Sequence, residues 1–385
     1  MKPQTTIRYS INRERLTDTF TELCEIDSPS FEERDIADFL TRLMTDLGAE
    51  SVVEDESAEK TGSNSGNLIV RFPGTIEKEP IFFACHMDTV NPGRGVEVFR
   101  TGDIFTSRGN TILGGDDKSG IAALIEMLRV LREDKLPHGP IEIIFTTCEE
   151  VGLLGAKNFN PGFVQAKIGY ALDSTGIDRV IVGAPAANRL KITVHGIAAH
   201  AGLNPEQGVS AFCLAAHAIA GLRLGRLDEE STANFGLIHG GVAANIIPDL
   251  ITIEGEVRSH SPAKLKEYTR KITAAFQKVV LHEATHVKGK HQPSVEIEVE
   301  TDYPAMRLSD HETVVDRVKQ AADILERKVV FEVAGGGSDA NIFNSYGLRT
   351  AIIATGMNKV HTTEECLDLR DLTKLTELLL AIIEV

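Results

Sequence analysis

The sequence lacks the features of a secreted, disulfide-stapled or membrane-spanning protein. Its 385 residues include only five cysteines, an odd number, and three of them (Cys85, Cys148 and Cys213) lie inside or beside apolar runs. This usage indicates reduced core thiols and favours the cytoplasm. The N-terminal segment has no apolar signal-peptide core, and no uninterrupted apolar stretch approaches the length of a membrane span. We therefore expect neither export nor membrane insertion.

The chain also lacks an excess of basic residues. It has 56 Asp and Glu against 40 Lys and Arg, which gives a formal net charge of −16. The field of such a surface repels nucleic acid and anionic membranes, so we expect neither as a partner. With 42% hydrophobic residues the chain can bury a large core, and its length favours two domains.

Four apolar, β-branched runs are each followed by a histidine or an acid. The run IFFAC precedes His86, IEIIFTT precedes Glu149 and Glu150, IGYAL precedes Asp173, and TAIIA comes shortly before His361. Continuous apolar runs are typical of strands buried on both faces, and open α/β sheets bind ligands beyond the carboxyl ends of such strands. The four polar ends are therefore predicted to meet at one site.

A further pair of carboxylates, Asp116 and Asp117, lies in the Gly-rich segment LGGDDKSG, just before the helical pattern IAALIEMLRVL. Together with the residues at the strand ends, it gives a site rich in carboxylate and imidazole and poor in sulfur. Hard or borderline divalent cations prefer such donors. The sequence therefore predicts a divalent metal site.

The order of the elements predicts two domains. Helical and strand patterns alternate up to Asp173, which favours an α/β fold with a mixed or parallel sheet flanked by helices. The pattern then changes to β-α-β-β-α-β, the order of a ferredoxin-like α+β unit. We place this inserted domain at residues 188–302 and the main domain at residues 1–187 and 303–385. Ser30 with Glu33 also fits a capping box that opens a helix ending near Leu47.

Eight motifs give the chain a family resemblance. They are HMDTV, GGDDKSG, CEEVGLLGA, ALDSTG, GIAAHAG, ANIIPD, GGGSDAN and HTTEE. In this order, and with the inserted domain, the chain resembles the co-catalytic dizinc exopeptidases, which include aminoacylases, glutamate carboxypeptidases, succinyl-diaminopimelate desuccinylases and peptidase T. Within this group it is most similar to the peptidase T-like tripeptidases, over nearly its whole length. The resemblance implies a zinc-exopeptidase-type sheet, a lid domain that forms a homodimer, and a short peptide as substrate.

The resemblance also implies a set of metal ligands. His86 would bind one zinc ion and His361 the other, Asp116 would bridge them, and Glu150 and Asp173 would be terminal ligands. Two Zn²⁺ per subunit are expected, although the same donors accept Co²⁺ or Mn²⁺. Each metal would keep a position open to water or substrate, as a catalytic zinc requires.

Two further acids would make the site catalytic. By resemblance, Glu149 is the general base that takes a proton from the metal-bridging water and later gives it to the leaving amine. Asp88, two residues after His86, would accept the second ring N–H of that histidine and fix its tautomer. Asp117 would either support the neighbouring ligands or be structural.

The resemblance assigns substrate contacts as well. His200 would reach across a dimer interface and stabilise the oxyanion in the partner's site. Arg258 would bind the substrate carboxylate, because its planar donor fork suits that group. Asn245 would add a hydrogen bond, and Gly336 and Gly337 belong to a loop whose backbone can approach a ligand closely.

Three alternatives remain at this point. His282, Glu283 and His286 spell the H-E-x-x-H motif of zincins, at the end of a predicted helix. Removal of the N-terminal residue of a tripeptide is the expected reaction, but the same dizinc chemistry serves carboxypeptidases and N-acyl-amino-acid amidohydrolases. A catalytically silent relative that binds peptides or metals is a third possibility, which the retained Glu149 disfavours.

Overall fold

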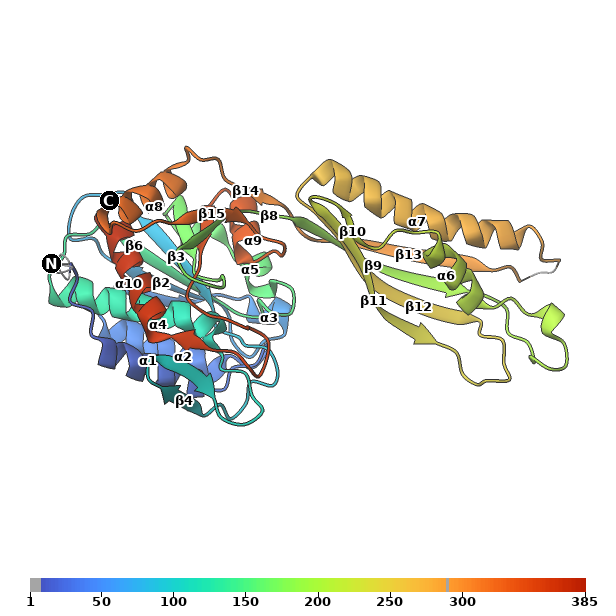
Figure 1. The fold of residues 1–385 in the computed structure, drawn as a ribbon, viewed down its shortest axis with the longest axis horizontal. Helices are drawn as coiled ribbons and strands as arrows, with labels where there is room; N and C mark the ends of the chain where they lie inside the picture. Colours follow the sequence, from blue (N-terminus) through green and yellow to red (C-terminus); the bar gives the residue numbers. More distant parts are fainter. Residues whose placement is uncertain (1–7, 289–290) are drawn as a thin grey trace. The chain divides into compact units, whose positions relative to one another are not determined.

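The computed structural model describes residues 8–288 and 291–385, and the chain divides into two compact units (Figure 1). The main unit comprises Met1–Gly183, Arg307–Ala334 and Ser338–Val385. The inserted unit comprises Ala184–Met306 and the short segment Gly335–Gly337. The predicted insertion at 188–302 lies within this second unit. The unit is a few residues longer at each end, and it also includes the three glycines 335–337, which come later in the sequence.

A nine-stranded mixed sheet forms the centre of the main unit. The order along it is β1 (Ser51–Glu54), β2 (Leu68–Phe72), β6 (Ile141–Thr146), β3 (Ile81–His86), β7 (Ile168–Ala171), β16 (Arg349–Ile353), β8 (Arg179–Ala184) and β14 (Met306–Arg307), with β15 (Val330–Val333) paired to β8. Every residue of β3 and β6 is buried, as expected for strands covered on both faces. The predicted α/β class is confirmed.

The four strands that precede the candidate ligands are neighbours and run in the same direction. β3 pairs in parallel with β6 on one side and with β7 on the other, and β16 pairs in parallel with β7. Their carboxyl ends therefore share one edge of the sheet, which confirms the prediction from the apolar runs. This edge, called the site edge below, carries His86, Glu149, Glu150, Asp173 and His361.

Helices cover this sheet. They are α1 (Arg13–Glu25), α2 (Arg34–Asp46), α3 (Ala58–Thr61), α4 (Gly115–Glu133), α5 (Leu154–Asn158), α8 (Thr313–Ile324), α9 (Asp339–Ser345) and α10 (Leu369–Glu384), with a 3₁₀ turn at Pro161–Phe163. Helix α4 packs against β3 and against α1 and α10, while α9 packs against β16 and β7. A small sheet joins β4 (Val98–Thr101), β5 (Ile104–Ser107) and β17 (Leu367–Asp368). Among the described helices, none is long and apolar enough to cross a membrane.

The predicted capping box at Ser30 is wrong. Glu33 is itself the residue that precedes α2, and it makes no side-chain cap hydrogen bond. The Ser30 hydroxyl instead donates to Asp88 Oδ2 at 2.7 Å, and Glu33 accepts the backbone N–H of Cys148 at 3.0 Å. Both side chains are engaged by residues distant in sequence, which a local motif does not reveal.

The inserted unit is a ferredoxin-like α+β fold. Its sheet has the order β10 (Gly225–Asp228), β11 (Ser231–Gly240), β12 (Leu250–Ser259), β9 (Ala186–His195) and β13 (Ser294–Tyr303), with all neighbours antiparallel. Helix α6 (Ala211–Ala220) follows β9, and α7 (Pro262–Ala284) connects β12 to β13; a 3₁₀ turn at Pro205–Gln207 precedes α6. Apart from the additional edge strand β10, the inserted unit has the predicted split βαβ arrangement.

The inserted unit has an apolar core of its own, in which Phe276 of α7 is fully buried and meets the Phe235 ring edge-on. We expect Phe276→Ala to cost about 3–5 kcal/mol, because the cavity adds to the lost apolar burial. Hydrogen exchange should show the loss of protection in the inserted unit first, while the main sheet keeps its protection. Gln277→Ala, at the exposed next position, is the matched control. Equal effects of the two substitutions in urea unfolding would contradict this account of the core.

Candidate metal centre

Asp116 lies between two histidines at the site edge. Its Oδ1 is 3.1 Å from His86 Nε2 and its Oδ2 is 3.2 Å from His361 Nε2. Glu150 Oε1 is 3.0 Å from the same His361 nitrogen. Thus one carboxylate presents one oxygen to each imidazole, and residues separated by more than half of the chain meet in space.

The donor set fits divalent cations. Single ligand atoms of His86, Asp116 and Glu150 all lie within 4.8 Å of one another. Glu150 Oε1 is buried and faces the His361 nitrogen at 3.0 Å, and a cation between these two atoms would bind both. His86 Nδ1 lies 2.8 Å from the carbonyl oxygen of Asp88, which can only accept. The ring therefore donates through Nδ1, and Nε2 is left with the lone pair that a metal ligand requires.

The prediction that the Asp88 carboxylate accepts the ring N–H of His86 is wrong, because another atom of Asp88 makes this contact. The backbone carbonyl of Asp88 fixes the tautomer, and its carboxylate lies 3.7 Å from the ring nitrogen. That carboxylate instead accepts the backbone N–H groups of Glu149 at 2.9 Å and Glu150 at 3.2 Å. Asp88 therefore positions both the His86 ring and the turn that carries Glu149.

A second buried acid holds this turn from the other side. Glu33 accepts the Cys148 backbone N–H at 3.0 Å, and the hydroxyl of Ser63 donates to its other oxygen. Cys148 itself has a left-handed backbone, with φ of +52°, which an L residue adopts only when its surroundings impose it. The geometry of Glu149 thus depends on Glu33 and Asp88, and sequence reasoning assigned no such role to Glu33.

Glu365 orients the loop that carries Asp116. Its carboxylate accepts the backbone N–H groups of Leu113 at 2.8 Å, Gly114 at 2.9 Å and Asp116 at 3.1 Å. Asp117, by contrast, accepts the backbone N–H of His86 at 3.3 Å, in line with its expected structural place. Glu365 belongs to the same HTTEE motif as His361, and this motif is the sequence signal for it.

Buried negative charge dominates the electrostatics of the site edge. Burial, together with the charge of Asp173, raises the pKa of Glu149 well above its ordinary value. Burial and the charge of Asp116 raise the pKa of Asp173 in the same way. The neighbouring carboxylates of Asp116 and Glu150 raise the pKa of His361 to about 10. Such a concentration of like charge is stable only when cations offset it.

The predicted substrate residues fall at two ends of the inserted unit. His200 and Asn245 lie on adjoining exposed segments, since His200 bridges to Ile246 and the Ala201 N–H donates to the Asn245 carbonyl at 2.9 Å. At the other end, a Cβ on Gly336 would lie 3.4 Å from a guanidinium nitrogen of Arg258.

Gly337 meets the same end of the inserted unit closely. Its N–H donates to the Tyr303 hydroxyl at 3.2 Å, and a Cβ there would approach the Tyr303 ring to 2.3 Å. Only glycine fits this contact. Arg258 already pairs with Glu256 at 2.9 Å, and its Nε is buried without a partner among the described residues.

The H-E-x-x-H segment shows no comparable cluster. His282 and His286 are exposed, with ring centroids 4.7 Å apart, and His286 Nδ1 lies 2.8 Å from the carbonyl oxygen of His282. Within the described ranges, the group of three or more candidate ligand side chains is the one at His86, Asp116 and Glu150. The geometry therefore favours the site edge over the zincin alternative.

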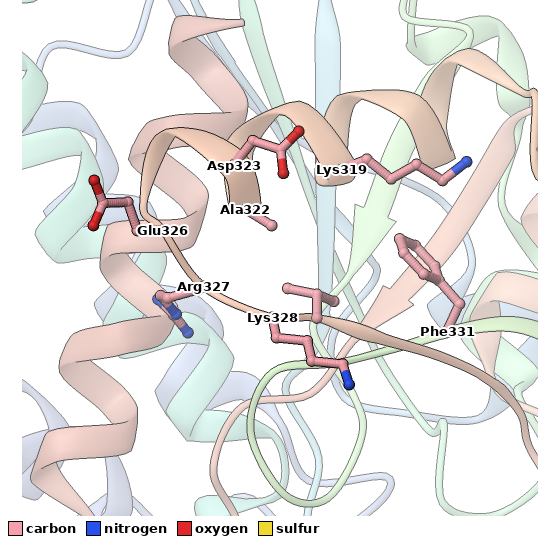
Figure 2. Close-up of a pocket in the computed structure, with 8 residues that line it drawn as sticks. Lys319, Ala322, Asp323, Glu326, Arg327, Lys328 and Phe331 are labelled. Atoms are coloured by element: carbon pink, nitrogen blue, oxygen red, sulfur yellow. The ribbon is translucent and has the colours of Figure 1, made fainter.

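Figure 2 shows a separate pocket of about 440 Å³ between the end of α8 and β15. Lys319, Arg327, Lys328 and Phe331 contribute to its lining. Arg327 is already engaged by Asp178, and Lys319 pairs with Asp316 at 3.2 Å. The lining contains none of the residues of the site edge, and we assign the pocket no part in the chemistry.

Comparisons with known proteins agree with this geometry. The model of Peptidase family M20/M25/M40 matches residues 82–385. The crystal structure of aminopeptidase PepT from Bacillus cereus ATCC 10987 is 41% identical, with a TM-score of 0.89, and covers 97% of this chain and 98% of its own. That of a tripeptidase from Staphylococcus aureus is 38% identical, with a TM-score of 0.91 and the same coverage.

A relative from Bacillus subtilis (strain 168), the protein YqjE, is 40% identical over 375 residues, 97% of this chain and 99% of its own. The resemblance read from the eight motifs is thereby confirmed, since the matching structures are named as PepT and as a tripeptidase. The chain belongs to Peptidase family M20/M25/M40.

Proposed function

We propose that the protein is a metal-dependent aminopeptidase that releases the N-terminal residue of tripeptides. The observation that carries this proposal is the position of Asp116 between His86 and His361, on the edge that also holds Glu149. The family assignment makes the chain a peptidase, and the two similar solved structures are an aminopeptidase and a tripeptidase. A short peptide is accordingly the proposed substrate.

The proposed cofactor is a pair of zinc ions. His361, Asp116 and Glu150 would hold one, because these three residues are in mutual reach. His86 and Asp116 would hold the other, with Asp173 as the remaining acid. When bound, such ions polarise the scissile carbonyl and lower the pKa of water. Cobalt or manganese would suit the same donors.

Glu149 is the proposed general base. The N–H groups of Glu149 and Glu150 are both fixed by Asp88, so the turn presents the two side chains in constant geometry. The carboxylate of Glu149 takes a proton from the attacking water and returns it to the departing amine. Carboxypeptidase or N-acyl-amino-acid amidohydrolase activity would use the same steps, and Arg258 would bind a substrate carboxylate in each case. A silent binding protein would not need Glu149.

The geometry of the inserted unit supports a homodimer. Strand β12 extends from Leu250 to Ser259. At the usual rise per residue of a strand, Leu250 and Arg258 are about 27 Å apart. His200 and Asn245 lie beyond the Leu250 end of β12, because the segments that carry them continue past the His195–Leu250 pair and bridge at His200 and Ile246. An extended tripeptide is only about 10 Å long, so it cannot touch His200 and Arg258 of one subunit. His200 is therefore proposed to act in the partner's site.

An apolar surface on the inserted unit offers a place for the second subunit. Strand β10 covers only Ser231–Ala233 of β11, and the rest of β11 has no neighbouring strand on that side among the described residues. Leu237 and Ile238 on this open edge are 52% and 51% exposed, and Phe212 of α6 is 56% exposed. Open edges with apolar side chains favour strand pairing with a second copy.

A cytoplasmic location is part of the same proposal. The five cysteines are free, and Cys24, Cys85 and Cys148 are buried, in accord with a reducing compartment. We propose no nucleic acid or membrane as a partner, since the net charge of −16 opposes both.

Replacing the base should abolish hydrolysis without unfolding the protein. We expect Glu149→Gln to lower kcat for a free tripeptide by about 10²- to 10⁴-fold, because the amide cannot accept the proton. Bound metal, measured by mass spectrometry, and the thermal midpoint should stay at wild-type values. Unchanged hydrolysis would eliminate the role proposed for Glu149.

Bound metal should depend on the histidines of the site edge. His86→Ala and His361→Ala should each lower the metal content from about two ions per subunit, since each removes one ligand of a shared pair. The His282→Ala, His286→Ala double variant is the control and should retain both metal and activity. Loss of metal in the control, with wild-type content in His86→Ala, would favour the zincin alternative.

Mixed dimers test whether His200 acts across the interface. His200→Ala and Glu149→Gln are each expected to be inactive alone, but in a mixed dimer one site receives both native residues. Equal amounts exchanged by mild denaturation and refolding should recover about a quarter of wild-type activity. Each variant refolded alone is the control. A mixture that stays inactive, although mass spectrometry detects mixed dimers, would place His200 in its own subunit's site or outside catalysis.

A further inference from the structure

Asp339 is a buried acid at the site edge with one oxygen unused. It is the first residue of α9 and is only 5% exposed. Its Oδ2 accepts the Thr146 hydroxyl at 2.5 Å, whereas Oδ1 is buried without a hydrogen-bond partner among the described residues. Thr146 ends β6, three residues before Glu149. The side chain is therefore anchored at the site edge, and half of its hydrogen-bonding capacity is available.

Several of the neighbouring acids already have partners, although Asp117 Oδ1 is buried without one among the described residues. Asp88 accepts backbone N–H groups, as Glu33 and Glu365 do. Asp116 and Glu150 contact the histidine rings. Asp339 is outside the group of candidate metal ligands found among the described residues. Its unused oxygen is thus left for another cation or donor.

Asp339 lies near the proposed base Glu149, because Thr146, which anchors its carboxylate, stands three residues before Glu149. Its charge is among the causes, after burial and Asp173, that raise the pKa of Glu149. Lys157 of α5 exerts an opposite charge on Asp339, but no hydrogen bond from it reaches the unused oxygen. A ligand group bound at Asp339 would consequently lie near the atoms that react.

The substrate of an aminopeptidase carries a cation at that distance. Its N-terminal ammonium nitrogen is two bonds, about 2.5 Å, from the carbonyl carbon that is attacked. The residue that recognises this ammonium must therefore lie beside the base. A buried carboxylate without a partner is costly, and an ammonium would satisfy it with a strong charge-assisted hydrogen bond.

We propose that Asp339 binds the free N-terminal ammonium of the substrate and so selects unblocked peptides over N-acylated ones. This inference rests on the proposed aminopeptidase function and gives it a specificity residue. The carboxylate is held in advance by the Thr146 hydroxyl, and its helix is fixed by the capping box of Ser338 and Asn341. Such support from neighbouring residues is what a selective contact requires.

The test compares two substrates in two enzymes. Wild type and Asp339→Asn are assayed, with metal content verified, on a free tripeptide and on its des-amino analogue, in which hydrogen replaces the ammonium. We expect Asp339→Asn to lower kcat/KM for the free tripeptide by about 10- to 100-fold, because a charged hydrogen bond is lost. The des-amino analogue should change by less than about threefold. Asp35→Asn, an exposed acid in the first turn of α2, is the matched control and should affect neither.

A second variant covers the case in which Asp339→Asn does not fold. Thr146→Val keeps the carboxylate but removes its anchor, and it should reduce the same preference for the free tripeptide to a smaller extent. Equal losses on both substrates, or no loss on either, would overturn the inference and leave Asp339 a structural residue. A wild-type enzyme that does not cleave the free tripeptide would refute the proposed function itself, which is a separate outcome.

Discussion

The site edge depends on one constraint, which is that several carboxylates and two imidazoles are buried together where like charges repel. Part of the negative charge is offset within the protein, because Asp88, Glu33 and Glu365 accept backbone N–H groups. The remaining charge, centred on Asp116 and Glu150, pairs with the two histidines. Divalent cations are the groups that balance such a set, and the same cations make it chemically useful.

The fold solves the problem of bringing these residues together. Parallel neighbours β6, β3, β7 and β16 end on one edge, so residues far apart in the sequence need no long side chains to meet. The hydrogen bonds of Asp88 and Glu33 then fix the turn of Glu149 and Glu150. Rigid placement of the proposed base Glu149 is what a proton transfer at a defined atom requires.

Much of this was predictable from the sequence, for a physical reason. Apolar runs that end in His86, Glu150 and Asp173 indicate buried strands, and strands of that kind impose a common edge. The ferredoxin-like insertion was also predictable, because each of its helices and strands has a pattern within a short stretch of sequence. What sequence patterns could not show are contacts through the backbone: the carbonyl of Asp88, not its carboxylate, meets His86, and Ser30 serves Asp88 instead of a helix cap. Asp339 had no signal beyond the Gly-rich turn, since its importance depends on an unpartnered oxygen that only packing defines.

The most direct test of the central claim is the anomalous diffraction of crystals loaded with zinc, recorded above and below the zinc edge. The account predicts two peaks at the site edge, each within about 2.0–2.2 Å of a histidine nitrogen and of an Asp116 oxygen. A single peak elsewhere, or peaks that leave Asp116 without a metal contact, would contradict it.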